Sequence, residues 1–408
     1  MARMPSALRL PALRAIVDTR AGRLLVGVVA VVALLTIVGL IALWPSGSGP
    51  TVDGAAKTTV GGTVTEVRSE SCGGPTEQQC RTAVVRVEDG ADQGAEVEVM
   101  LGPVEVSPDL QVDQNVRLID QSPAPGTPGA EDADAGPTYG FSGVDRRTPL
   151  LILALLFGIL GAVVARSRGV LALVGTGLSL SLVILWLVPA ILDGHPPLLV
   201  ATVGALAVMF VTTILTYGIT AQSLAAVTGI GVSLLVAGLL GVFWTGVTGL
   251  DGKESELSSF ALQGAGDLPL GGILLAGMVI GALGVITDTV VSQVSTVAAL
   301  HRANPKLSPR VLYREAFVVG RDHLSATIHT LVLAYAGATL PLLLVASASG
   351  IGFGDAVNDA GLAEPIVSTL VGSAALLLSV PLSTALAAAL VGRLPVEAIP
   401  DAGHHHHH

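Results

Sequence analysis

Long apolar runs separated by short polar segments are the main pattern of this 408-residue chain. A helix needs about 18 or more mostly apolar residues to cross the ~30 Å hydrocarbon core of a bilayer. Because an unpaired peptide group is costly in lipid, each run of this length is expected to be a helix. The pattern predicts an all-α membrane bundle of about eight transmembrane helices. The runs lie at 24–43, 149–165, 170–190, 198–217, 223–248, 268–287, 324–347 and 366–391.

Composition and charge agree with a membrane protein. Hydrophobic residues make up 51% of the chain and charged residues 13%, with a mean hydropathy of +0.72, which excludes an ordinary water-soluble globule. Five arginines from Arg3 to Arg23 precede the first run, so residues 1–23 are expected in the cytoplasm. Alternation then places the tail, 394–408, on the same side; His404–His408 resemble a purification tag. The first run is interpreted as a retained anchor, with a signal peptide as the alternative.

Residues 45–147 break the membrane pattern. They hold 17 acids and 7 bases, and 7 − 17 = −10 equals the formal net charge of the whole chain. The alternating segments predict a small extracytoplasmic all-β barrel over 45–120, followed by a flexible linker over 121–147. The acidic balance argues against nucleic acid as a partner. The expected strands lie at 58–70, 81–89, 95–101 and 116–120.

Cys72 and Cys80 are the only two cysteines, and they flank a short polar loop between two predicted strands. In an oxidising exterior they are expected to form a disulfide across this loop. A redox-active pair is the alternative.

Two later segments carry polar residues on one helical face. Asp288, Ser292 and Ser295 follow an i, i+4, i+7 stripe after the sixth apolar run. Asp322, Ser325 and His329 follow an i, i+3, i+7 stripe at the start of the seventh, next to Arg321. An ionisable residue in such a segment is a candidate functional site.

Two interpretations of these stripes remain open. In the first, the charges only end helices at the headgroup level, with an Arg321–Asp288 ion pair fixing the register. In the second, the stripes line a substrate or ion pathway. Asp288 or Asp322 then binds a cation or proton, and His329 relays or neutralises its charge near neutral pH.

Small residues and a proline suggest how these helices pack. Gly277, Gly281 and Gly284 precede Asp288 and are candidates for a close helix–helix contact. Pro381 lies inside the last apolar run and is expected to cause a packing kink, or else a broken helix at a binding site.

Three stretches give the chain a family resemblance. The Asp288–Ser292 segment, the GRDH motif from Gly320 to His323, and LAYAGATLPLLL over 333–344 resemble the YibE/F-like family of bacterial multi-pass membrane proteins, across most of 60–393. The chain departs from the family pattern at His329 and near Gln222. The resemblance implies a seven-helix transmembrane domain over 148–393 in a bacterial plasma membrane, with transport as the presumed activity.

The function favoured by these observations is gradient-coupled transport of a small solute or ion. No Walker, GxSxG, HExxH or CxxC motif is present in the sequence, so we expect no enzyme activity, no cofactor and no metal centre. The alternative is a non-transporting scaffold whose β domain recruits an envelope partner. An intramembrane enzyme would require a second acid or histidine beside Asp288. A homo-oligomer is a further possibility for the assembled protein.

Overall fold

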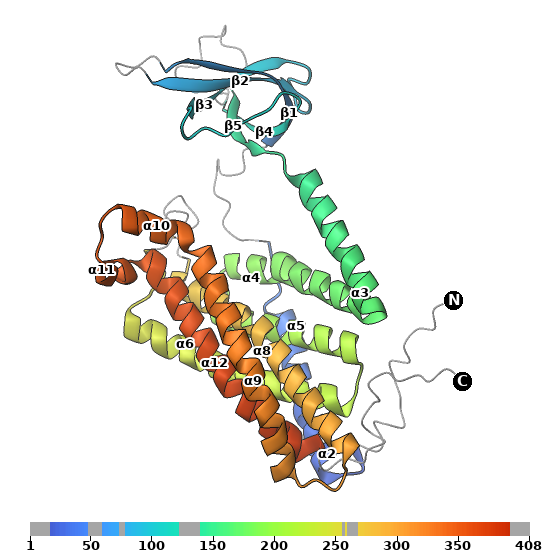
Figure 1. Cartoon of the computed structure of the whole chain (residues 1–408). Coiled ribbons are helices and arrows are strands. Elements are labelled where there is room, and N and C mark those ends of the chain that lie inside the picture. Colours follow the sequence, from blue (N-terminus) through green and yellow to red (C-terminus); the bar gives the residue numbers. More distant parts are fainter. Residues whose placement is uncertain are drawn as a thin grey trace, which may run out of the picture. The chain divides into compact units, whose positions relative to one another are not determined.

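The computed structural model describes residues 17–47, 59–72, 78–121, 139–254, 258 and 268–391 (Figure 1). The chain divides into two compact units. One is made of residues 52–160 and contains the strands; the other is made of residues 1–51 and 161–408 and contains most of the helices. This confirms the predicted fold class, a helical membrane protein with a β domain inserted after the first helix.

The β unit is one antiparallel sheet with strand order β3-β2-β1-β4-β5. Its buried side is formed mainly by valines and leucines of alternating strand positions, including Val64, Val85, Val116 and Leu118. The strands are β1 (Thr59–Ser71), β2 (Gln79–Val87), β3 (Glu96–Pro103), β4 (Asn115–Asp120) and β5 (Tyr139–Val144).

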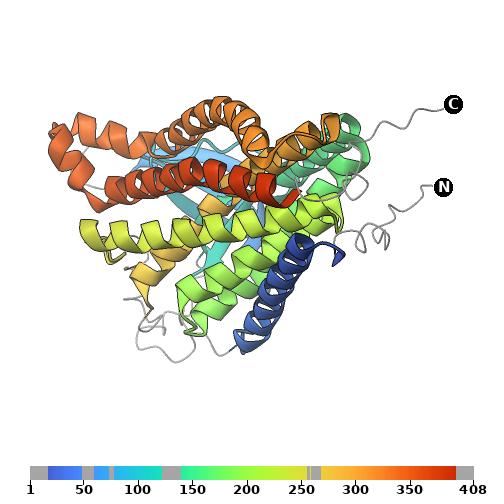
Figure 2. The same ribbon diagram turned by 90° about the horizontal axis from the view of Figure 1, so that it is seen from below.

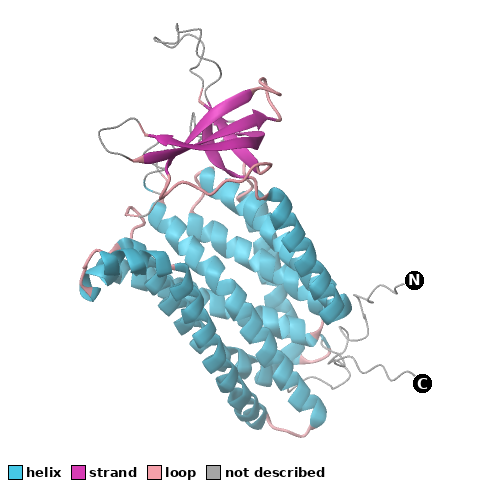
Figure 3. Ribbon diagram, turned by 45° about the horizontal axis from the view of Figure 1, so that its top comes forward, coloured by secondary structure: helices cyan, strands magenta, loops and turns pink. Residues whose placement is uncertain are grey.

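The sheet is curled, as Figure 3 shows. Register shifts interrupt three of its ladders, and bulges of this kind bend a strand and increase its twist. Gly62 permits a close approach of β1 and β2, because an added Cβ would lie 2.5 Å from Val85 Cγ1. The edge strands β3 and β5 contact each other, but among the described strands they are not paired by a ladder of hydrogen bonds.

The predicted linker, 121–147, is wrong at its C-terminal end. Strand β5 lies within it and pairs with β4, with Tyr139 opposite Asp120 and Phe141 opposite Leu118. Tyr139 is only 6% exposed and joins the core of the sheet. The pattern was missed because two glycines in this six-residue strand dilute its alternation.

The disulfide prediction is confirmed. Cys72 and Cys80 are bonded, and their Cα atoms lie 5.0 Å apart at the end of the β1–β2 pair. The bond closes a loop whose residues 73–77 lie outside the described part of the chain.

Reduction of this disulfide should loosen the β unit selectively. A short loop contributes about 2–3 kcal/mol through the crosslink. We therefore expect amide hydrogen exchange in β1 and β2 to become about 30- to 150-fold faster in the Cys72→Ser, Cys80→Ser double variant. The amides of the helical unit serve as the internal control and should exchange at an unchanged rate. Less than a twofold change in β1 and β2 would contradict the expected stabilisation.

The helices account for all of the predicted apolar runs. Seven of the described helical segments are long and apolar enough to cross a membrane, and one bent pair makes up to eight. The helices are α2 (Arg20–Ala42), α3 (Arg147–Leu182), the π-helix η1 (Val183–Leu187), α4 (Val188–Leu192), α5 (Pro197–Tyr217), α6 (Ala221–Thr248), α8 (Leu270–Ala303), α9 (Pro309–Ala338), α10 (Leu340–Ala348), α11 (Phe353–Asn358) and α12 (Ala360–Val391).

Two breaks interrupt the helices. The first lies in α3, between two predicted runs, and the second lies inside a run that was predicted to be continuous. Arg166 has φ 52° and ψ −137° and divides α3 into the spans Arg147–Arg166 and Gly169–Leu192. The predicted run 324–347 corresponds to the second half of α9 and to α10, and the helix axis bends by 56° between them. Pro341 lies in the first turn of α10, and a proline cannot donate the hydrogen bond that would continue the helix across this bend.

Helix α8 lies at the centre of the helical unit, because it contacts α5, α6, α9 and α12. Figure 2 shows α6 and α12 side by side, and the two helices are also in direct contact. The centre is apolar, with Ile230, Ile286, Val290 and Leu376 fully buried.

Helix α2 is part of this packing. Leu25 is 2% exposed, and the Trp186 indole donates a hydrogen bond to the Leu40 carbonyl at 3.2 Å. These contacts join α2 to the helical unit.

Candidate functional site

The two predicted polar stripes lie on neighbouring antiparallel helices. Helices α8 and α9 are joined by residues 304–308, and they bring Asp288 opposite His323 and Gln293 opposite Gly320. The α5–α6 connection lies at the same end of the unit, near Ser295, where residues of α5, α6 and α8 line one small pocket. At 1.5 Å per residue, Asp288 lies about 10 Å along α8 from Ser295, towards the middle of the helix.

Asp288 of α8 and His323 of α9 form an ion pair between the two helices when the imidazole is protonated. The distance from His323 Nε2 to Asp288 Oδ2 is 3.8 Å, and the side chains are 39% and 73% exposed, respectively. This separation is longer than a hydrogen bond, so the attraction is mainly electrostatic and depends on a protonated imidazole. The alternative Arg321–Asp288 bridge is not formed; His323 takes that place because it is the α9 residue that faces Asp288.

The second stripe has the predicted spacing, but it is directed away from the helical core. Arg321, Asp322, Ser325 and His329 are all exposed on α9. The Ser325 hydroxyl donates to the Arg321 carbonyl of its own helix at 3.3 Å. The structure therefore places His323, rather than His329, beside Asp288.

The two remaining residues of the first stripe, Ser292 and Ser295, differ in their exposure. Ser292 is partly buried, and its carbonyl accepts a hydrogen bond from the Thr296 hydroxyl at 2.9 Å. Ser295 is exposed and lines the small pocket together with Tyr217, Gln222 and Ser223. Asp288 and His329 are not among the residues that line this pocket.

A buried polar layer lies beside the Asp288 stripe and was not predicted. Its six members are uncharged and at most 1% exposed. The Thr384 hydroxyl lies 2.9 Å from Gln293 Oε1 and connects α12 with α8. Thr289 follows Asp288 directly, and three α12 hydroxyls flank Pro381, which are sequence signals that could have pointed to this region. The layer consists of Ser233, Thr289, Gln293, Ser379, Ser383 and Thr384.

The close helix contacts use other glycines than those predicted. A Cβ added at Gly229 of α6 would lie 2.9 Å from Val290 Cγ1 and 3.4 Å from Ser383 Cβ. A Cβ added at Gly320 of α9 would lie 2.6 Å from Gln293 Nε2. The predicted glycines are exposed, since added Cβ atoms at Gly277 and Gly284 would meet nothing within 4 Å and at Gly281 only the Tyr335 hydroxyl, at 3.4 Å. That prediction is corrected: they lie on the α8 face turned away from α6 and α12.

Pro381 is accommodated within the continuous helix α12. The hydroxyls of Ser383 and Thr384 donate to the Val380 carbonyl at 3.3 and 2.6 Å. Both bonds share one backbone acceptor, the Val380 carbonyl, and they leave the oxygen lone pairs of both hydroxyls available.

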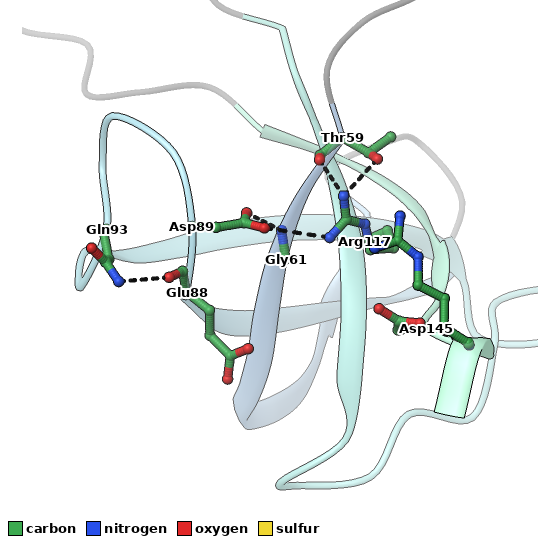
Figure 4. Close-up of polar contacts among 8 residues, drawn as sticks. Thr59, Gly61, Glu88, Asp89, Gln93, Arg117 and Asp145 are labelled. Carbon is green, nitrogen blue, oxygen red and sulfur yellow. Dashed lines mark hydrogen bonds and ion pairs between the residues drawn. The ribbon is translucent and has the colours of Figure 1, made fainter. Parts of the chain in front are cut away.

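The β unit holds a separate set of polar contacts (Figure 4). The Arg117 guanidinium donates to the carbonyl and hydroxyl of Thr59, and Asp89 lies 3.6 Å from its Nη1 atom. Asp89 also accepts a hydrogen bond from the Gly61 amide. These contacts connect β1, β4 and the end of β2, which indicates a structural role in fixing the sheet.

Tyr139 is the titratable group of the β unit with the largest shift. Burial, together with the hydrogen bond to Asp92 at 2.7 Å, raises the pKa of Tyr139 to about 12. The phenol therefore stays protonated and donates to Asp92 throughout the physiological range. In the described part of the chain, no group of three or more His, Cys, Asp or Glu residues is placed to hold a metal ion.

Comparisons with known proteins identify the helical part of the chain. Residues 153–393 match the family described as YibE/F-like protein, whereas no curated protein and no solved structure matches. The match covers more than half of the chain and includes α5, α6, α8, α9 and α12; strands β1–β5 lie outside it, although the resemblance was expected to begin near residue 60. The chain therefore belongs to the YibE/F-like protein family.

Proposed function

We propose that this protein is a secondary transporter of a small solute or ion in a bacterial plasma membrane. Both termini are cytoplasmic in this proposal and the β unit is outside, in keeping with Arg20 and Arg23 at the start of α2. The pathway runs along α8 and α9 near the end where the two helices are joined.

The observation that carries the proposal is the Asp288–His323 pair, which joins the membrane-length helix α8 to α9, the first part of a bent helix pair that can form one span together with α10. An ionisable residue within a transmembrane segment is costly, so it is retained mainly where it binds something or relays charge. Asp288 supplies a carboxylate that binds a cation or a proton. His323 lies within 4 Å and competes for the same carboxylate when its imidazole is protonated.

The partly exposed position of the pair supports exchange with the surroundings. Asp288 is 73% exposed, so its carboxylate is not enclosed by the packing of α8 against α6 and α12. The exposed polar residues of α9, including Asp322 and His329, extend this polar face along the neighbouring helix. A scaffold role would require none of these side chains to exchange ions.

Reconstitution of the full chain into liposomes tests the proposal. A pH-sensitive dye inside the vesicles reports proton movement while gradients of Na⁺, K⁺ or protons are imposed, with choline as the control cation. We expect at least one gradient to drive proton flux above that of protein-free vesicles. If radiolabelled cations and the dye both show only the protein-free rate under every gradient, the transporter proposal fails and the scaffold becomes the better explanation.

A further inference from the structure

The Thr384 hydroxyl of the buried polar layer lies within hydrogen-bond distance of two acceptors. The Thr384 hydroxyl has one proton but lies 2.6 Å from the Val380 carbonyl and 2.9 Å from Gln293 Oε1. When the proton is given to the nearer carbonyl, Thr384 Oγ1 and Gln293 Oε1 are two acceptors in contact. Turning the Gln293 amide would relieve this contact but would leave the rest of the layer unchanged.

Thr289 gives an independent indication of a missing ligand. Its side chain is 0% exposed, and its hydroxyl oxygen has no hydrogen-bond partner among the residues that the structure describes. Thr289 and Gln293 are four residues apart on α8, so they lie on the same face one turn apart. A buried hydroxyl without a partner is destabilising, and a bound ligand would supply the missing interaction.

We propose that Thr289, Gln293 and Thr384 bind a monovalent cation, with Na⁺ the best match, through their side-chain oxygens. The members of the layer are neutral hydroxyl and amide groups, whereas protein sites for Ca²⁺ and Mg²⁺ rely on carboxylates. Asp288, which precedes Thr289, carries its negative charge on the exposed face of α8 beside His323, so the layer itself is neutral.

The geometry of the layer links this site to the helices of the proposed pathway. Gln293 comes from α8 and Thr384 from α12, and the Gln293 amide lies against Gly320 of α9. A cation held there stabilises one packing of these three helices. This inference rests on the proposed function, for which Na⁺ would be the coupling ion.

Thermal unfolding of the purified full chain tests the site. NaCl is titrated against choline chloride at constant ionic strength, and ²²Na⁺ binding is measured on the same samples. We expect a saturable rise in Tm with Na⁺ for the unaltered chain. Thr289→Val and Thr384→Val should each weaken the apparent Kd for Na⁺ at least ~10-fold. Without Na⁺, Thr289→Val should be at least as stable as the unaltered chain, because it removes an unpartnered hydroxyl.

Thr213→Val is the matched control. Thr213 lies on α5, is 1% exposed, and its hydroxyl also lacks a partner among the described residues, but it is outside the layer. Its valine variant should keep the full response to Na⁺. The inference is overturned if Na⁺ and choline shift Tm equally, or if both layer variants bind ²²Na⁺ as the unaltered chain does. Proton or K⁺ flux in liposomes without Na⁺ dependence would also reject this site while leaving the proposed transport function standing.

Discussion

Replacement of Asp288 by asparagine should reduce cation-driven flux in proteoliposomes by at least ~100-fold, which corresponds to about 2.7 kcal/mol. Asparagine has nearly the same size but carries no charge, so it neither attracts a cation nor pairs with a protonated His323. Because the Asp288 side chain is 73% exposed, the substitution leaves the helix contacts of α8 in place, and the variant should fold normally.

Asp355→Asn is the matched control for this prediction. Asp355 lies in the first turn of the short helix α11, outside α8 and α9, and its variant should keep the flux of the unaltered chain. Asp322→Asn then tests the exposed stripe of α9, where loss of flux would extend the pathway to Asp322. Flux within twofold of the unaltered chain for a folded Asp288→Asn variant would remove the carboxylate from the mechanism.

The number and order of the helices follow from the sequence because a lipid environment strongly restricts which segments can cross a membrane. A membrane-crossing helix must be long and apolar, and the predicted runs coincide with α2, α3, α5, α6, α8, α12 and the bent pair α9 and α10. The length of α8 beyond its apolar run was harder to predict. The apolar run ends at residue 287, but α8 continues to Ala303 with Val290, Val294 and Val297 buried. Hydropathy averages over all faces of a helix and therefore underestimates a segment that is polar on one face and packed on the other.

The candidate site was predicted only in part for a similar reason. Residue spacing gives the angle between side chains on one helix, so the Asp322, Ser325 and His329 stripe has the expected geometry. Spacing does not tell which neighbour a stripe faces, and in the structure His323 faces Asp288 while His329 is exposed. Gln293 and Thr384 were not paired in advance, because they are 91 residues apart and the packing of α8 on α12 brings them together.

Replacement of Gly229 by leucine should destabilise the helical unit by about 3 kcal/mol. The space beside Gly229 is filled by Val290 of α8 and Ser383 of α12, and even a Cβ would lie 2.9 Å from Val290 Cγ1. Leucine is a better helix former than glycine by less than ~1 kcal/mol, which is too little to offset the overlap. The three helices must therefore separate, and the Gln293–Thr384 contact should be lost with them.

Gly231→Leu provides the comparison within the same helix. An added Cβ at Gly231 would meet nothing within 4 Å, so leucine there should be neutral or slightly stabilising through helix propensity. The difference between the two variants in thermal unfolding isolates the packing at Gly229 from any general effect of leucine on α6. Equal Tm values would mean that α6 does not pack this closely on α8 and α12, and the buried polar layer would then lack the enclosure on which its proposed cation site depends.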